Sequence, residues 1–225
     1  MKDNKAYNVL REMAIDGYNL ATDYGYASDW YSHAREQVAI FAEEVAPDLP
    51  VEYVSGIIAI TSANCTVREN FSRAYQYLTT GSLGNCVTLC RMCDNYQRDY
   101  FTTGNPNIVG SIRKEGVLQY TDKTNEFRKN ICPVNGDDNA VTVDRHIFHA
   151  VGGDSQSHRF QAIAIILKLA EELQMKPSEV QACIWYTVKW DKGHRNVGSP
   201  TYTCPFSPFI IADWLIEEKL GGAVC

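Results

Sequence analysis

Long apolar runs are missing from this sequence of 225 residues. The longest, Ile163 to Leu167, is far shorter than the roughly 20 apolar residues that a membrane-spanning helix requires. The first residues, Met1 to Lys5, are charged and polar, and they precede an amphipathic pattern with no small-residue cleavage site. The sequence therefore predicts neither a membrane span nor a signal peptide, and we expect a cytoplasmic location.

Positive charge is also scarce. The chain has 21 Lys and Arg against 27 Asp and Glu, which gives a net charge of −6 at pH 7. This balance argues against a protein that binds nucleic acid chiefly by neutralising phosphates, although it leaves room for a local basic groove. One basic cluster lies near the C-terminal end, at Lys189, Lys192, His194 and Arg195, and we predict that it contacts phosphate.

Signs of a disulfide framework are missing as well. The eight cysteines are scattered over a chain without a secretory signal, so we expect free thiols. Cys86, Cys90 and Cys93 have a spacing that radical enzymes use to hold an iron-sulfur cluster. The same spacing puts three thiols on one face of a helix, where cysteine acts as a small apolar residue. Because no strand-helix alternation accompanies it, we predict no metal site and no other cofactor.

Helical periodicity dominates what the sequence does contain. Hydrophobic residues make up 45% of the chain and charged residues 21%, as in ordinary globular domains. Apolar residues recur at helical spacing, and strand patterns are nearly absent. We predict helices at about residues 7–21, 28–41, 54–60, 67–78, 83–96, 123–131, 144–151, 157–173, 177–190 and 208–220, with a loop at 102–107. The predicted fold class is all-α, a compact multi-helix array in which residues 1–225 form a single globular unit.

Two short motifs near the middle of the chain carry chemistry. The first is Asp122–Phe127 (Asp-Lys-Thr-Asn-Glu-Phe), the second is Val143–Phe148 (Val-Asp-Arg-His-Ile-Phe), and a loop at Cys132–Asn139 separates them. The pair resembles the helix-hairpin-helix DNA glycosylase superfamily, whose members start one helix with Lys-Thr and the next with Val-Asp-x-His. That resemblance implies a multi-helix fold that acts on DNA.

The resemblance extends on both sides of these motifs. Segments 55–62, 68–71 and 181–185 are similar to largely uncharacterised, bacteriophage-borne members of the superfamily. The matching region covers about residues 50–190, which we expect to form a glycosylase-like core. A phage-encoded protein of this kind would act in the cytoplasm of the host cell.

The resemblance implies catalytic roles for Asp144 and Lys123. Cleavage of an N-glycosidic bond builds positive charge on the sugar, so a carboxylate is needed close to the developing oxocarbenium ion. Asp144 would be that carboxylate, and Lys123 would be an amine that attacks the sugar and forms a Schiff base. Each residue also has a plain structural interpretation, as a helix N-cap for Asp144 and a solvated side chain for Lys123.

Further residues are predicted to bind substrate, namely His146, Asn70, Trp185, Lys189 and Arg195. A histidine two residues after Asp144 would contact a phosphate, and a tryptophan would stack on a base. Both residue types are also common as structural residues of a helix.

Two features of the superfamily are reduced in this chain. DNA-binding members carry Gly-x-Gly before the lysine, where backbone N–H groups hold a phosphate, but this stretch has Gly116 alone. Many members also end with four cysteines that hold an iron-sulfur cluster, and this chain has Cys204 and Cys225 there. We therefore predict weak binding to unmodified duplex DNA and no cluster.

The function that these observations favour is excision of a base from DNA by cleavage of the N-glycosidic bond. One alternative is a transferase of the same fold that modifies an altered pyrimidine in DNA. A second alternative is a non-catalytic scaffold that binds a nucleotide or a host or phage protein. The expected partners are thus DNA, a nucleotide or a protein, and not a membrane.

Overall fold

The computed structural model describes residues 4–22, 25–63, 65, 67–108, 120–153 and 156–191. Helices make up most of this part of the chain, which confirms the predicted all-α class. They are α1 (Asn4–Tyr18), α2 (Trp30–Val45), α3 (Val51–Thr61), α4 (Val67–Thr80), α5 (Val87–Thr103), α6 (Tyr120–Ile131), α7 (Arg145–Ala150), α8 (Gln156–Leu173) and α9 (Pro177–Asp191). A short antiparallel pair of strands, β1 (Ala21–Thr22) and β2 (Gly25–Tyr26), and a 3-10 turn, η1 (Ala27–Asp29), connect α1 to α2.

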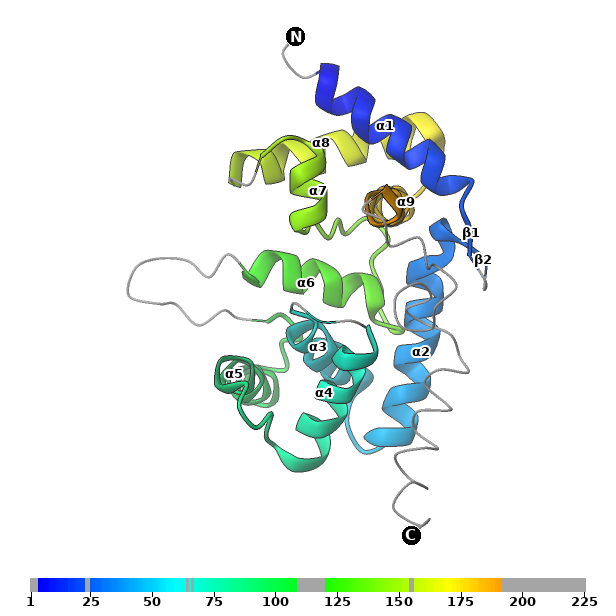
Figure 1. Ribbon diagram of the computed structural model, residues 1–225. Helices are drawn as coiled ribbons and strands as arrows, with labels where there is room; N and C mark the ends of the chain where they lie inside the picture. Colours follow the sequence, from blue (N-terminus) through cyan, green and yellow to red (C-terminus); the bar gives the residue numbers. More distant parts are fainter. Residues whose placement is uncertain are drawn as a thin grey trace.

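The helices pack in two layers with α6 between them (Figure 1). Helices α1, α7, α8 and α9 form the upper layer, and α2, α3, α4 and α5 form the lower one. Each layer has its own apolar core, built around Phe41, Ile57 and Phe71 below and around Leu10 and Ile166 above. Helices α2, α6, α7 and α9 meet where the two layers join, so side chains from distant parts of the sequence come together there.

Helix α3 is the central helix of the lower layer. It is buried from Tyr53 to Thr61, in agreement with its nearly uninterrupted apolar sequence. Gly56 permits the close approach of α5, because a Cβ atom at this position would lie 2.2 Å from the ring of Tyr96. That ring is parallel to the ring of Tyr53, with 5.5 Å between the centroids. A glycine at position 56 is therefore required for α3 and α5 to pack in this way.

Helix α5 is displaced from its predicted position at 83–96. It begins at Val87 because Gly84, with φ of +56°, holds the preceding residues in a turn. It ends at Thr103, where Gly104 adopts the left-handed conformation with φ of +67° and closes the helix. The first two residues of the predicted loop are thus helical, and that prediction was wrong for them.

Several predictions concern residues outside the described part of the chain. These are the helix at 208–220, Gly116, Lys192, His194, Arg195, Cys204 and Cys225. Among the helices that are described, none is long and apolar enough to cross a membrane.

Candidate functional site

Asp144 lies directly before α7 and uses both of its carboxylate oxygens. Its Oδ1 accepts hydrogen bonds from the backbone N–H groups of His146 and Ile147, at 2.9 and 3.1 Å. This is the N-cap arrangement that the plain interpretation of the sequence predicts. Its Oδ2 accepts a third bond, from the indole Nε1 of Trp185 on α9 at 3.1 Å. The half-buried carboxylate is therefore held in one orientation by two separate helices.

Aromatic rings gather beside this carboxylate. The ring of Trp30, at the start of α2, lies 6.0 Å from the ring of Trp185 and 6.1 Å from that of Phe127 on α6. It also meets the ring of Tyr31 edge-on at 4.6 Å. We call Trp30, Tyr31, Phe127 and Trp185 the aromatic cluster. Its members come from α2, α6 and α9, and one of them, Trp185, contacts the Asp144 carboxylate.

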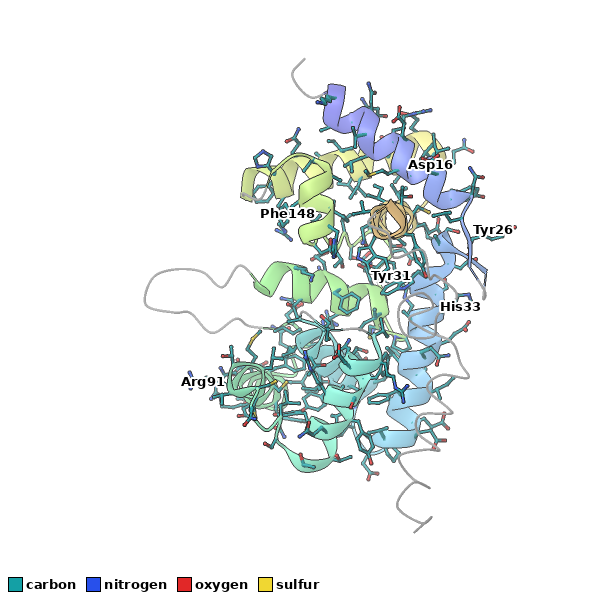
Figure 2. The ribbon with its side chains drawn as sticks, viewed as in Figure 1. Asp16, Tyr26, Tyr31, His33, Arg91 and Phe148 are labelled. Carbon is teal, nitrogen blue, oxygen red and sulfur yellow. The ribbon has the colours of Figure 1, made fainter. Side chains whose placement is uncertain are left out.

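Tyr31 is the buried member of the aromatic cluster. It lies at the upper end of α2, below α9 (Figure 2), and its hydroxyl donates a hydrogen bond to Oε1 of Gln181. Burial raises the pKa of Tyr31 above its ordinary value, and the negative charge of Asp144 acts in the same direction. Tyr31 therefore stays neutral and donates its proton within the protein.

The loop between α6 and α7 is held by a polar network, which fixes the start of α7 and so the position of Asp144. The Asn130 side chain donates to the carbonyls of Asp137 and Ala140 at 3.0 and 2.9 Å, and it accepts from the Thr142 hydroxyl at 2.8 Å. Asn130 is fully buried, so these bonds replace the water that it gives up on folding.

Asp138 ties the same loop to both layers. It forms ion pairs with Arg35 of α2 at 2.6 Å and with Lys176 before α9 at 2.8 Å. Burial acts to raise the pKa of Asp138, but hydrogen bonds from Lys176 and Arg35 hold that pKa below its ordinary value. The loop before Asp144 is therefore rigidly connected to the helices that carry the aromatic cluster.

Lys123 lies in the first turn of α6, four residues before Phe127. Residues at this spacing share one face of a helix, so Lys123 continues the side of α6 that meets the aromatic cluster. Burial raises the pKa of Cys65 to about 11, and the charges of Arg73 and Lys123 act against that rise, so Lys123 is within electrostatic range of Cys65 in the α3–α4 turn. Within the described residues no hydrogen bond or ion pair joins Lys123 to Asp144.

Asn70 is buried in the first turn of α4, with 4% of its surface exposed. Its Oδ1 accepts a hydrogen bond from the hydroxyl of Thr61 at 2.7 Å, which fixes the orientation of the carboxamide. Among the described residues its two amide N–H groups have no hydrogen-bond partner. They are a pair of donors close to the α3–α4 turn, near which Lys123 lies.

Comparison with known sequences identifies one match. The chain belongs to DUF7178, a family of unknown function. The match covers residues 10–192, so it includes Asn70, Lys123, Asp144 and Trp185. No curated protein and no solved structure matches the chain.

The structure shows less of the three remaining predicted site residues, His146, Lys189 and Arg195. His146 is half-buried, and its backbone N–H donates a hydrogen bond to Oδ1 of Asp144. The side chain of Lys189 and the whole of Arg195 lie outside what the structure describes. The structure thus brings Trp185 and the backbone of His146 into contact with Asp144, and among the described residues no hydrogen bond or ion pair joins Asn70 or Lys123 to Asp144.

The three cysteines with iron-sulfur spacing lie at α5, Cys86 directly before it and Cys90 and Cys93 within it. Cys93 is buried, whereas Cys86 and Cys90 are half-buried, and all three are free thiols. In the part of the chain that the structure describes, no three Cys, His, Asp or Glu side chains are grouped so that they could hold a metal ion.

Sequence reasoning missed the partners that position this site. Gln181 bonds to Tyr31 across 150 residues, and the Asp144–Trp185 bond spans 41 residues. The local spacing of residues carries no signal for such contacts. The aromatic character of Trp30 and Trp185 was visible in the sequence, but not that the two rings meet.

Proposed function

We propose that this member of DUF7178 is a DNA glycosylase-like enzyme that cleaves the N-glycosidic bond of a base in DNA. The observation that supports it best is the carboxylate of Asp144, whose two oxygens are oriented by the start of α7 and by Trp185 beside the aromatic cluster. A side chain that served only as an N-cap would need one of these oxygens.

The held carboxylate suits the charge that develops in this reaction. As the bond between the base and C1′ breaks, the base leaves with the bonding electrons and the sugar becomes an oxocarbenium ion. A fixed negative charge stabilises that ion without first having to reorganise, and the effect is larger where water is partly excluded. Asp144 is half-buried and fixed at both oxygens, so it meets these requirements.

The aromatic cluster offers a surface for an extruded base. Bases stack on tryptophan and phenylalanine rings with little dependence on sequence, at a gain of about 1–3 kcal/mol each. Trp30, Phe127 and Trp185 are each partly exposed, and Trp185 contacts the carboxylate directly. Enzymes that act on a base in DNA take it out of the stack and hold it in such surroundings.

Asn70 and Lys123 complete the proposed site from the side of the α3–α4 turn. The two amide N–H groups of Asn70 would donate to the acceptors of a base edge, and Lys123 would attack C1′ or contact a phosphate. If Lys123 attacks, the protein is a lyase as well as a glycosylase. If water attacks C1′ instead, the products are the free base and an abasic site.

Release of a free base from DNA tests this function. The full chain is incubated with single-stranded and duplex oligonucleotides that carry normal or modified bases, and the solution is analysed by mass spectrometry. We expect one base class to be released while the strand is left abasic or nicked. Borohydride trapping then separates the two mechanisms, since a covalent adduct that Lys123→Gln abolishes requires an amine nucleophile.

A non-catalytic scaffold is the second function, and one observation favours it. In the described residues no hydrogen bond or ion pair joins Lys123 to Asp144, and the capping bonds of Asp144 have a structural use on their own. A scaffold of this kind would bind a nucleotide or protein without releasing a base from any oligonucleotide. A transferase acting on an altered pyrimidine would instead yield DNA with a changed mass and no abasic site.

A further inference from the structure

A cavity lies between α6, the loop that follows it, and α8, apart from the aromatic cluster. Its volume is about 270 Å³, and it is lined by Glu126, Asn139, Val141, Arg159, Ile163 and Leu167. In Figure 1, α8 lies above α6, and the cavity belongs to the junction of the two layers. Pockets for drug-sized ligands hold roughly 300–1,000 Å³, so this cavity suits a smaller molecule.

Side chains of opposite charge line the cavity. Arg159 is 8% exposed, which is far below the usual exposure of arginine. A guanidinium has five N–H donors, so it can bind a ligand carboxylate in addition to its contacts within the protein. Glu126 has a half-buried carboxylate whose Oε1 accepts from Lys129 at 2.8 Å, and in the described residues no bond is made by its Oε2.

The remaining walls of the cavity are mostly apolar. Val141 is buried and Ile163 is half-buried, whereas Leu167 is one of the large apolar side chains that stay exposed, at 41%. Asn139 adds a carboxamide that can donate and accept. An exposed leucine in the wall of a cavity is covered when an apolar ligand group lies against it, and this burial contributes to affinity.

We infer that this cavity binds a free α-amino acid with a small aliphatic side chain. The carboxylate of the ligand would bind Arg159, its ammonium group would bind Oε2 of Glu126, and its side chain would lie on Val141, Ile163 and Leu167. A simple anion has no donor for Oε2 of Glu126, and a simple amine has no acceptor for the N–H groups of Arg159. A zwitterion carries one group of each kind.

Calorimetric titration with ligands of matched shape tests this inference on the full chain. The probes are leucine, valine and alanine, the methyl ester of each, and the matching acid that lacks the amino group, which is 4-methylpentanoate for leucine. We expect at least one of the amino acids to bind, and its ester and deaminated analogue to bind at least tenfold more weakly. Absence of binding by all three amino acids at millimolar concentration would overturn the inference, as would equal binding of the ester and the acid.

Two variants connect the binding to the cavity. Glu126→Gln keeps the size of the side chain and removes its charge, so we expect about tenfold weaker binding of the amino acid and little change for the deaminated analogue. Glu36→Gln is the control, because Glu36 also faces a basic partner three residues away, His33 at 3.6 Å, but lies on α2 outside the cavity. Equal losses in the two variants would contradict the assignment.

Nuclear magnetic resonance of labelled methyl groups locates the site independently of any variant. On titration with the binding amino acid, the methyl signals of Val141, Ile163 and Leu167 should shift, and those of the lower layer, such as Ile57, should stay in place. Shifts confined to the lower layer would overturn the assignment. Because none of these measurements uses DNA, failure of the amino-acid site and failure of the proposed glycosylase activity are distinguishable.

Discussion

The indole N–H of Trp185 donates to Oδ2 of Asp144 at 3.1 Å, although the two residues are 41 positions apart. Oδ1 already caps α7. The bond from Trp185 to Oδ2 therefore restricts the remaining rotation of the carboxylate about the Cβ–Cγ bond. Asp144 thus holds α7 and α9 together, and its negative charge lies at the edge of the aromatic cluster.

The bond from Trp185 should contribute to both stability and activity. Trp185→Phe keeps an aromatic ring and removes the N–H donor, so Oδ2 of Asp144 loses its protein partner. We expect unfolding in urea to become easier by about 1–3 kcal/mol, as for hydrogen bonds to charged groups. We also expect base release to slow by about tenfold, since a carboxylate that can rotate has to be oriented during the reaction.

Tyr77→Phe is the matched control for that prediction. It removes another aromatic donor to a carboxylate, since the Tyr77 hydroxyl donates to Asp94 at 2.9 Å in the lower layer. The variant should lose a similar stability while base release stays at the wild-type rate. If both variants slow base release equally, the effect of Trp185 is one of general stability.

Buried tyrosines should make the protein less stable at high pH. Burial raises the pKa of Tyr31, Tyr53, Tyr77 and Tyr96 above the ordinary value. The unfolded chain therefore loses these protons first as the pH rises past about 10, so the stability is full below that pH and falls above it.

Each such tyrosine adds up to about 1.4 kcal/mol per pH unit to the decrease in the free energy of unfolding at high pH. Urea unfolding between pH 9 and pH 11 measures the slope, and Tyr31→Phe should reduce it by the share of one residue. A free energy of unfolding that stays constant over this interval would show that the tyrosines ionise in the folded protein.

Variants of Thr61 and Asn70 distinguish the structural role of Asn70 from its proposed contact with substrate. Thr61→Val and Asn70→Ala both remove the bond between these side chains, and each should cost about 1–2 kcal/mol of stability. Asn70→Ala also removes the amide donors, so it alone should weaken the binding of the substrate DNA. Equal substrate affinities of the two variants, measured by fluorescence anisotropy, would remove Asn70 from the proposed site.

Gly56 tests the packing of α3 against α5. Alanine favours helix formation over glycine by about 1 kcal/mol, so Gly56→Ala would stabilise an isolated helix. Here the new Cβ atom would lie 2.2 Å from the buried ring of Tyr96, and overpacking of this kind costs about 1–3 kcal/mol or more. We expect a lower melting temperature by circular dichroism. A higher melting temperature would mean that α5 moves aside without loss.

The sequence predicted the helices well where apolar spacing and end signals agree. Pro177 and the acidic Glu179 in the first turn mark the start of α9, and the predicted helix at 54–60 lies within α3. The bounds of α5 were predicted poorly, because Gly84 and Gly104 act through backbone conformations that periodicity does not contain. Local pattern also favoured Asp144 as an N-cap, which the structure confirms.

The contacts that make Asp144 more than an N-cap could not be predicted from the sequence. They depend on how α9 packs against α7 and on how Trp30 reaches Trp185, and these are long-range arrangements. Lys123 shows the opposite case, since its spacing from Asp144 resembles a known pair, while in the described residues no hydrogen bond or ion pair joins the two side chains. The roles of Lys123, Asn70 and His146 stay predictions.

The rate of base release by Asp144→Asn tests the central claim most directly. Asparagine caps helices as well as aspartate does, but its amide N–H groups conflict with the N–H of Trp185, so we expect a stability loss of up to about 2 kcal/mol. The variant should remain folded at 25 °C, which circular dichroism checks. Asp94→Asn serves as the control for a lost carboxylate elsewhere.

In single-turnover experiments on the base that wild-type protein releases, Asp144→Asn should be slower by about a hundredfold or more, because a preorganised charge is lost where positive charge develops. Asp94→Asn should react at the wild-type rate. If folded Asp144→Asn releases the base as fast as the wild type does, Asp144 is a helix cap without a catalytic role, and the proposed function is wrong at its central residue.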